Sequence, residues 1–271
     1  MIFIKTPEEI EKMRAACDLV SRTLGEVAKW VKPGVTTLKL DTIAREFILD
    51  NGGKPACLGY HGFPGTLCIE VNETVVHGFP SNYALREGDI VGTDCVAELD
   101  GWNGDSCYTF AVGEIDEKKQ ALLTVTRESL YRGIQAATAG KRIGDISNAV
   151  QTYCERHGYS VVREMCGHGI GKSMHEDPEV PNYGRRGIGP ALKPGMLICV
   201  EPMINMGSKN IVIERNGWEC RTRDRKPSAH FEHTILITDG EPEILTTFDH
   251  IERALLGGAG EDKQEITINE G

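Results

Sequence analysis

Apolar and polar positions follow a helical period near the start of the chain. Over 10–27, apolar side chains recur every three or four positions, as in a helix that buries one stripe. Thr6 and Pro7 suit an N-cap and a first helical position. The spacing predicts a helix over 7–31, and a similar pattern predicts a second long helix over about 117–138.

The chain repeats one pattern at a constant offset of 106 positions. Residues 33–52 and 139–158 share two glycines, an aromatic position and the apolar spacing, and each copy lies between a long helical stretch and strand-like sequence. The simplest interpretation is two α-α-β halves, about 5–112 and 113–248, related by a pseudo-two-fold axis. The alternative is a chance likeness of two amphipathic helices. A period of this length excludes a solenoid.

Strand signals occur in both proposed halves, as runs of β-branched and aromatic residues bounded by turn residues. They fall at 68–76, 89–99, 102–112, 196–200, 210–214 and 231–238. We therefore expect an α+β protein in which helices flank a curved antiparallel sheet. Residues 1–250 form one predicted catalytic domain, and 251–271, poor in core residues, are predicted to be a mobile tail.

Composition narrows the classes of function. The 30 basic and 40 acidic residues give a net charge of −10, which repels nucleic acid and anionic lipid. The nine cysteines are odd in number and form no C-x-x-C pair, so they are predicted to be reduced thiols. Charge appears too early for a secretory signal, and no apolar run approaches the ~18 residues of a membrane span. We expect a cytoplasmic protein without membrane or nucleic-acid partners.

Two aspartates flank a hairpin signal at Asp100-Gly101. If the neighbours of this turn pair, Asp94 lies opposite Cys107, and Asp105 lies on the same face. The two carboxylates then become diagonal neighbours, with Cα atoms roughly 7 to 8 Å apart. Such a pair can converge on metal ions, although on the hairpin alone a turn aspartate at Asp105 and a buried hydrogen-bonded aspartate at Asp94 are the favoured interpretation.

Two histidines lie in one glycine-bounded segment. His168 is set between glycines, where the backbone can approach a ligand closely, and His175 follows seven positions later. The spacings of phosphate-binding glycine loops are absent, and so are those of H-E-x-x-H zinc sites and nucleophile elbows. A structural histidine remains the alternative for each.

Two glutamates interrupt apolar strand sequence. Glu201 ends the run 196–200 before Pro202, and Glu232 lies within the apolar stretch 231–238. A buried charge is costly without a partner, so each glutamate needs either a salt bridge or a metal.

Together these residues suit a pair of metal ions. Four carboxylates balance two divalent cations, and without metal they would repel one another or take up protons. Shared carboxylates leave room for a bridging water whose pKa the ions lower, so hydrolysis is the natural reaction. Oxygen-rich, histidine-poor ligation argues against a structural zinc site of the thiolate type and admits manganese, iron, cobalt or zinc as the catalytic ion. The five candidates are Asp94, Asp105, His168, Glu201 and Glu232.

The order of these motifs resembles the type I methionine aminopeptidases, which have the pita-bread fold. The resemblance runs from about residue 5 to residue 248 and includes Cys57–Pro64, Asn72-Glu73, His77-Gly78, Asp94 with Gly104-Asp105, Gly167–Glu176, Val200–Met203 and Glu232–Thr234. It departs from the family at Gly92-Thr93, at Phe63 and at Met174, which leaves the candidate ligands unchanged and affects the pocket.

By this resemblance, Asp94, Asp105, His168, Glu201 and Glu232 would bind two divalent ions. Glu201 would accept the proton of the attacking water. His77 would lie near the scissile amide nitrogen, and His175 would stabilise the tetrahedral intermediate. The pocket for the methionine side chain would be lined by Cys57, Tyr60, Phe63, Cys68, Met174 and Trp218.

The implied activity is removal of the N-terminal methionine from nascent proteins and peptides with a small second residue. The resemblance also implies a monomer, and the activity implies transient ribosome contact, which the acidic net charge does not support. Two alternatives share the fold. One is an X-Pro dipeptidase or aminopeptidase P, which usually carries an additional N-terminal domain. The other is a non-enzymatic binding protein, which typically loses metal ligands.

Overall fold

The computed structural model describes residues 1–261. Its helices are α1 (Pro7–Ala28), α2 (Thr37–Asp50), α3 (Glu117–Gln135), α4 (Ile143–Arg156) and α5 (Asp249–Glu261), with a short 3₁₀ helix at Tyr60–Gly62. Its strands are β1 (Lys54–Pro55), β2 (Leu67–Val71), β3 (Thr74–Val76), β4 (Ile90–Leu99), β5 (Trp102–Ala111), β6 (Ser160–Val161), β7 (Gly167–Gly169), β8 (Glu176–Val180), β9 (Leu197–Val200), β10 (Met203–Asn205), β11 (Ile211–Ile213), β12 (Cys220–Thr222), β13 (Ser228–His230), β14 (His233–Leu236) and β15 (Glu243–Ile244).

Both predicted long helices are confirmed, with small differences at their ends. The side chain of Thr6 accepts a hydrogen bond from the backbone of Glu9, and Glu9 bonds back to Thr6, so α1 begins with a capping box. The predicted helix over 7–31 ends at residue 28, and the one over 117–138 ends at residue 135.

Strand pairings within the sheets are antiparallel throughout the described chain. One sheet has the order β1-β4-β2 with β5 paired to β4, and another has the order β15-β14-β9-β7-β8. Two three-stranded sheets, β13-β10-β6 and β11-β12-β3, complete the arrangement. The predicted strand 68–76 is divided into β2 and β3 because Asn72 adopts a left-handed φ of 50°.

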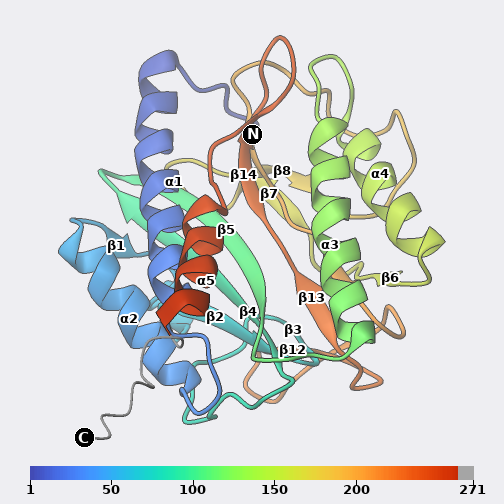
Figure 1. Ribbon diagram of the computed structural model, residues 1–271. Coiled ribbons are helices and arrows are strands. Elements are labelled where there is room, and N and C mark those ends of the chain that lie inside the picture. Colours follow the sequence, from blue (N-terminus) through green and yellow to red (C-terminus); the bar gives the residue numbers. More distant parts are fainter. Residues whose placement is uncertain (262–271) are drawn as a thin grey trace, which may run out of the picture.

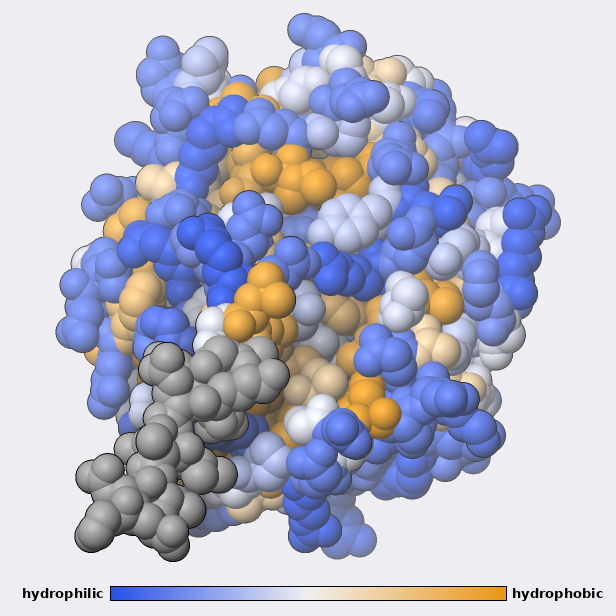
Figure 2. All heavy atoms as spheres, in the orientation of Figure 1, coloured by the Kyte–Doolittle hydropathy of each residue, from blue (hydrophilic) through white to orange (hydrophobic). Residues whose placement is uncertain are grey.

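Helices cover the strands in two pairs. Figure 1 shows α1 and α2 on one side and α3 and α4 on the other, with the strands running between the pairs. One buried cluster contains Leu19, Leu40, Leu122, Val150 and Ile251, so all five helices contribute to it. On the face seen in Figure 2, hydrophilic side chains predominate, with small apolar areas between them. This α+β arrangement of paired helices around antiparallel strands was predicted.

The predicted start of a mobile tail at residue 251 is wrong. Residues 249–261 form α5, and Ile251 is fully buried. α5 packs closely on α1 because Gly25 has no side chain: a Cβ there would lie 2.6 Å from the Cβ of His250. The remainder of the predicted tail, 262–271, lies outside the described residues.

No helix within residues 1–261 is long and apolar enough to cross a membrane. All nine cysteines are free thiols, as predicted, and every one except Cys166 is buried.

Candidate active site and metal-ligand cluster

The β4–β5 hairpin places the two candidate aspartates on one face. Asp100 and Gly101 both have positive φ, which forms the tight turn, and Asp94 pairs with Cys107 as predicted. Because side chains alternate along a strand, Asp105 projects from the same face as Cys107. The predicted hairpin register is therefore confirmed.

The other three candidates come from the second large sheet and its edge. His168 lies on β7, Glu201 directly follows β9, and Glu232 lies between β13 and β14. The Nε2 atom of His168 is 3.7 Å from Asp105 Oδ2 and 3.5 Å from Glu201 Oε1. The backbone N–H of Glu232 donates to the carbonyl of Cys107 at 2.9 Å, which joins this sheet to β5.

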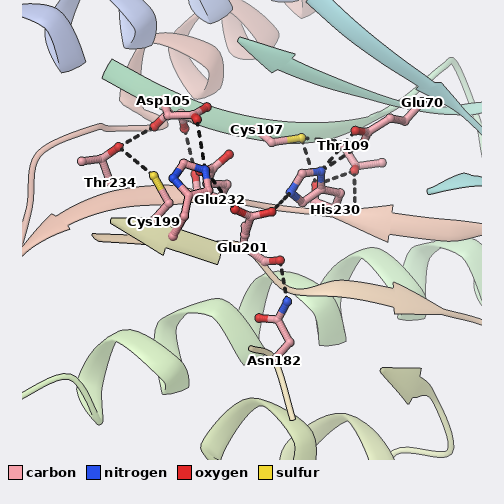
Figure 3. A network of polar contacts seen from close by, with 12 residues as sticks. Glu70, Asp105, Cys107, Thr109, Asn182, Cys199, Glu201, His230, Glu232 and Thr234 are labelled. Atoms are coloured by element: carbon pink, nitrogen blue, oxygen red, sulfur yellow. Dashed lines mark hydrogen bonds and ion pairs between the residues drawn. The ribbon is translucent and has the colours of Figure 1, made fainter. Parts of the chain in front are cut away.

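All five residues line a single cavity of about 670 Å³. Figure 3 shows Asp105, Glu201 and Glu232 directed toward one another, with Glu70 and His230 on one side and Cys199 and Thr234 on the other. The structure thus brings together five side chains that are separated by up to 138 positions in the chain.

Glycines allow β7 to approach its neighbours. A Cβ at Gly167 would lie 2.3 Å from the carbonyl oxygen of Cys199, and one at Gly169 would lie 2.2 Å from that of Asp177. Larger residues would push β7 away from β8 and β9. The imidazole of His168 would then lose its position beside Asp105.

The carboxylates of the cluster have strongly perturbed pKa values. Burial, followed by the charges of Glu232 and Asp94, raises the pKa of Asp105 well above its ordinary value. Burial also raises the pKa of Glu201 and of Glu232, and neighbouring carboxylates add to both effects. Burial lowers the pKa of His168 to about 4, so this imidazole is neutral near pH 7 and can act as a ligand.

Several buried oxygens of the cluster have no hydrogen-bond donor within the described part of the chain. These are Asp94 Oδ1, Asp105 Oδ1 and Glu232 Oε1. No lysine or arginine among residues 1–261 lines the cavity. Buried carboxylates without donors or cationic side chains require another source of positive charge. Oxygen atoms with one imidazole nitrogen suit divalent metal ions, so the residues fit the predicted cofactor.

An apolar pocket adjoins the acidic cluster. Cys57, Phe63, Cys68 and Met174 are buried together, and Trp218 packs against them. The rings of Phe63 and Trp218 lie 5.3 Å apart, edge to face. Val96 and Phe79 belong to the same apolar cluster, although the sequence analysis did not select them. This wall of sulfur and aromatic groups suits a flexible thioether side chain.

Tyr60 and the two remaining histidines line the same cavity. The hydroxyl of Tyr60 lies 3.1 Å from Nδ1 of His175, whose ring centroid is 4.4 Å from that of His168. The ring of His77 lies edge-on to Trp218 at 5.9 Å. Burial lowers the pKa of both His77 and His175, so both are neutral near pH 7.

Sequence reasoning missed a second buried group beside Glu201. The Nδ1 atom of His230 lies 3.2 Å from both carboxylate oxygens of Glu70, and Cys107 Sγ donates to Glu70 at 3.8 Å. Burial raises the pKa of Glu70 to about 7, although His230 lowers it. The sequence offered one signal for His230, which is its position two residues before the candidate ligand Glu232.

This group also explains one departure from the family pattern. Gly92 pairs with Glu70 across β2 and β4, and a Cβ at Gly92 would lie 2.3 Å from Glu70 Oε2. The glycine therefore makes room for the carboxylate. The cluster around Asp105 likewise includes Cys199, whose thiol lies close enough to share a cation with Asp105, His168 and Glu232.

Comparisons with known proteins identify the family of the chain. The model of metallopeptidase family M24 matches residues 11–239. The chain belongs to this family. It is 48% identical over 246 residues to a methionine aminopeptidase of Clostridium perfringens, a match that spans 91% of this chain and 99% of the relative. Within family M24, the chain therefore belongs to the methionine aminopeptidases, as the order of the motifs predicted.

Solved structures show the same relationship. A methionine aminopeptidase from Thermotoga maritima superposes with a TM-score of 0.90 at 44% identity, over 91% of this chain and all of that one. A prolidase from Pyrococcus horikoshii reaches a TM-score of 0.74 at 21% identity, over 91% of this chain and 64% of the prolidase, and shares the fold. The pita-bread fold is confirmed. This chain, as a member of family M24, is a metal-dependent aminopeptidase that acts on peptides and uses divalent metal ions.

Proposed function

We propose that the chain removes the N-terminal methionine from nascent proteins and peptides whose second residue is small. One observation carries the proposal: a pocket lined by thiols, aromatic rings and Met174 lies directly beside the buried carboxylates. A methionine side chain in this pocket would bring its own peptide bond to the acidic cluster. The family relatives support this choice, since they are named for the same substrate.

We infer that Asp94, Asp105, His168, Glu201 and Glu232 hold two divalent ions, of manganese, iron, cobalt or zinc. When bound, such ions activate water for attack and polarise the scissile carbonyl. The four carboxylates balance the charge of two ions. Their donor-free oxygens support this assignment, because a cation would offset both the burial and the mutual repulsion that raise the pKa values of Asp105 and Glu232.

The proposed proton acceptor is Glu201. Its carboxylate lines the cavity, and its backbone carbonyl accepts a hydrogen bond from the Asn182 side chain at 2.9 Å, which holds the residue after β9. Burial raises the pKa of Glu201, and a more basic carboxylate is a better acceptor near neutral pH.

Two neutral imidazoles complete the proposed reaction. His77 is assigned to the scissile amide nitrogen and His175 to the oxyanion of the tetrahedral intermediate. If the Tyr60 hydroxyl donates to Nδ1 of His175, the Nε2 atom carries the proton and can donate to developing charge. Their lowered pKa values keep both rings as neutral hydrogen-bond donors at pH 7.

The direct test is cleavage of Met-Ala-Ser against a matched Met-Lys peptide, with the purified protein supplied in turn with manganese, iron and cobalt. We expect release of methionine from Met-Ala-Ser alone. Absence of cleavage with all three metals would refute the proposal. A Gly-Pro dipeptide is the control for prolidase activity, and its preferential hydrolysis would favour that alternative.

Metal analysis addresses the ligands separately. We expect two ions per chain, and fewer when Glu232 is replaced by Gln, measured by elemental mass spectrometry after dialysis. If the protein binds fewer than two ions per chain even at saturating metal, and shows no peptidase activity, a non-enzymatic binding protein would be favoured.

We further infer that the chain is a cytoplasmic monomer in transient contact with the ribosome. Light scattering tests the monomer, and sedimentation with ribosomes tests the contact.

A further inference from the structure

We propose that Lys5 and Glu176 form a positioning pair for the active site. The pair holds the loop 170–175 between β7 and β8, which carries Met174 and His175. The inference rests on the proposed function, because it gives these two residues their roles in binding and hydrolysis. Lys5 is not among the described residues that line the cavity, so it would act through the loop.

The pair is enclosed and uses both oxygens of the carboxylate. The Nζ atom of Lys5 lies 2.5 Å from Glu176 Oε2, and the two side chains are only 5% and 8% exposed. The other oxygen, Oε1, accepts a hydrogen bond from the backbone N–H of Ser173 at 3.3 Å. Glu176 therefore links the N-terminal segment directly to the loop.

The N-terminal segment is itself fixed at this point. The backbone N–H of Lys5 donates to the carbonyl of Gly195, just before β9, at 2.8 Å. Ile2 forms a parallel bridge with Asp177 on β8, and Figure 1 shows the N-terminus beside β7 and β8. Phe3 lines the same cavity as the candidate ligands. The first five residues thus lie along the edge of the proposed active site.

The two ends of the loop are held by different elements. At its start, the side-chain amide of Asn103 on β5 donates to the carbonyls of Gly171 and Lys172, each at 3.1 Å. At its end, the loop is held by Glu176 and its partner Lys5. A Cβ at Gly171 would lie 2.6 Å from both Lys5 Nζ and Glu176 Oε1, so these contacts leave no room for displacement toward them.

The loop residues between these anchors are the ones that face the substrate. Met174 packs in the apolar pocket, and His175 lies between Tyr60 and His168. A buried ion pair adds little net stability compared with an apolar pair of the same shape, because both charges lose their hydration. Charge-assisted hydrogen bonds do define geometry closely. Positioning of the loop is therefore the function that this arrangement suits.

The experiment compares K5M with the double variant K5M/E176M. K5M leaves the Glu176 charge buried without its partner, so its thermal midpoint should fall. The double variant removes that charge, so its midpoint should recover toward wild type. In both variants we expect kcat/KM for Met-Ala-Ser to fall by about tenfold or more, with a lower kcat and a higher KM, because the loop carries both a pocket wall and a reacting group.

Reference variants separate the two roles and provide a control. M174A should mainly raise KM, and H175A should mainly lower kcat. R14M breaks the more exposed ion pair between Arg14 on α1 and Glu243 on β15, and should leave kcat and KM unchanged within about twofold. E176Q retains one acceptor oxygen, so its kinetic loss should be smaller than that of K5M/E176M.

The outcomes distinguish the two levels of inference. The positioning role would be overturned if the double variant recovered both stability and wild-type kinetics. It would also be overturned if the only defect of K5M were a lower fraction of folded enzyme, which would reduce the apparent kcat at constant KM. If wild type does not cleave the peptide, or if M174A and H175A retain full activity, the proposed function itself fails.

Discussion

Replacing Asp105 by asparagine should stabilise the metal-free protein while abolishing hydrolysis. Asp105 Oδ1 has no hydrogen-bond donor among residues 1–261, and the residue as a whole is 3% exposed. Burial and then the charges of Glu232 and Asp94 raise its pKa. Asparagine keeps the shape and removes the charge, so the metal-free fold loses a source of repulsion. The same change removes a proposed ligand, which explains the expected loss of activity.

The distances set the size of the effect. Ligand atoms of Asp105 and Glu232 lie within 4.8 Å of each other. Two unit charges at that separation repel by about 3 kcal/mol at an effective dielectric constant of ~20. Proton uptake relieves part of this repulsion in wild type, so we expect a gain of about 2 kcal/mol at pH 8. For a chain of this size that corresponds to a thermal midpoint higher by roughly 4 to 8 °C.

The sign of the pH dependence follows from the raised pKa. A carboxyl group with a higher pKa in the folded state destabilises the fold above its unfolded pKa of ~4. The metal-free wild type should therefore lose stability as the pH rises from about 4 toward the raised pKa of Asp105. The Asp105→Asn variant should show a weaker dependence over the same range.

Differential scanning calorimetry of chelator-treated proteins measures both effects. The control is Asp89→Asn, a buried aspartate whose oxygens accept hydrogen bonds from Asn72, the Tyr83 hydroxyl and the Arg86 backbone. This control should be destabilised, because it loses acceptors that are in use. If Asp105→Asn also lowers the midpoint of the metal-free protein, the repulsion inferred from the structure is wrong.

Three further changes test other parts of the site. Trp218→Ala should raise KM for methionyl peptides about tenfold with little change in kcat, because it opens the apolar pocket; steady-state kinetics showing the reverse pattern would contradict this. Tyr60→Phe removes the hydroxyl beside His175 and should lower kcat several-fold at constant KM, and an unchanged kcat would count against the proposed tautomer. Gly92→Ala should destabilise the protein by about 1 to 3 kcal/mol in urea unfolding, because its Cβ meets the Glu70 carboxylate, and the same substitution should cost clearly less in a Glu70→Ala background, where that carboxylate is absent; an equal cost in both backgrounds would contradict the steric account.

Local patterns were sufficient for the long helices and the central hairpin. The capping signal of α1 lies within four residues, and the Asp-Gly turn defines the register of β4 and β5 because side chains alternate along strands. The end of the chain was predicted less well. Whether Ile251 is buried depends on a distant glycine in α1, and no periodicity near residue 251 carries that information.

For the site, the sequence alone was enough to select the five candidate ligands, since motif order and charge balance are properties of the chain itself. Their convergence in one cavity and the donor-free state of their oxygens depend on how the sheets pack. The same holds for the partnerships of Glu70 with His230, 160 positions apart, and of Lys5 with Glu176, 171 positions apart. Such contacts join segments without a shared pattern, because burial and charge pairing act through space and only the folded chain decides which groups meet.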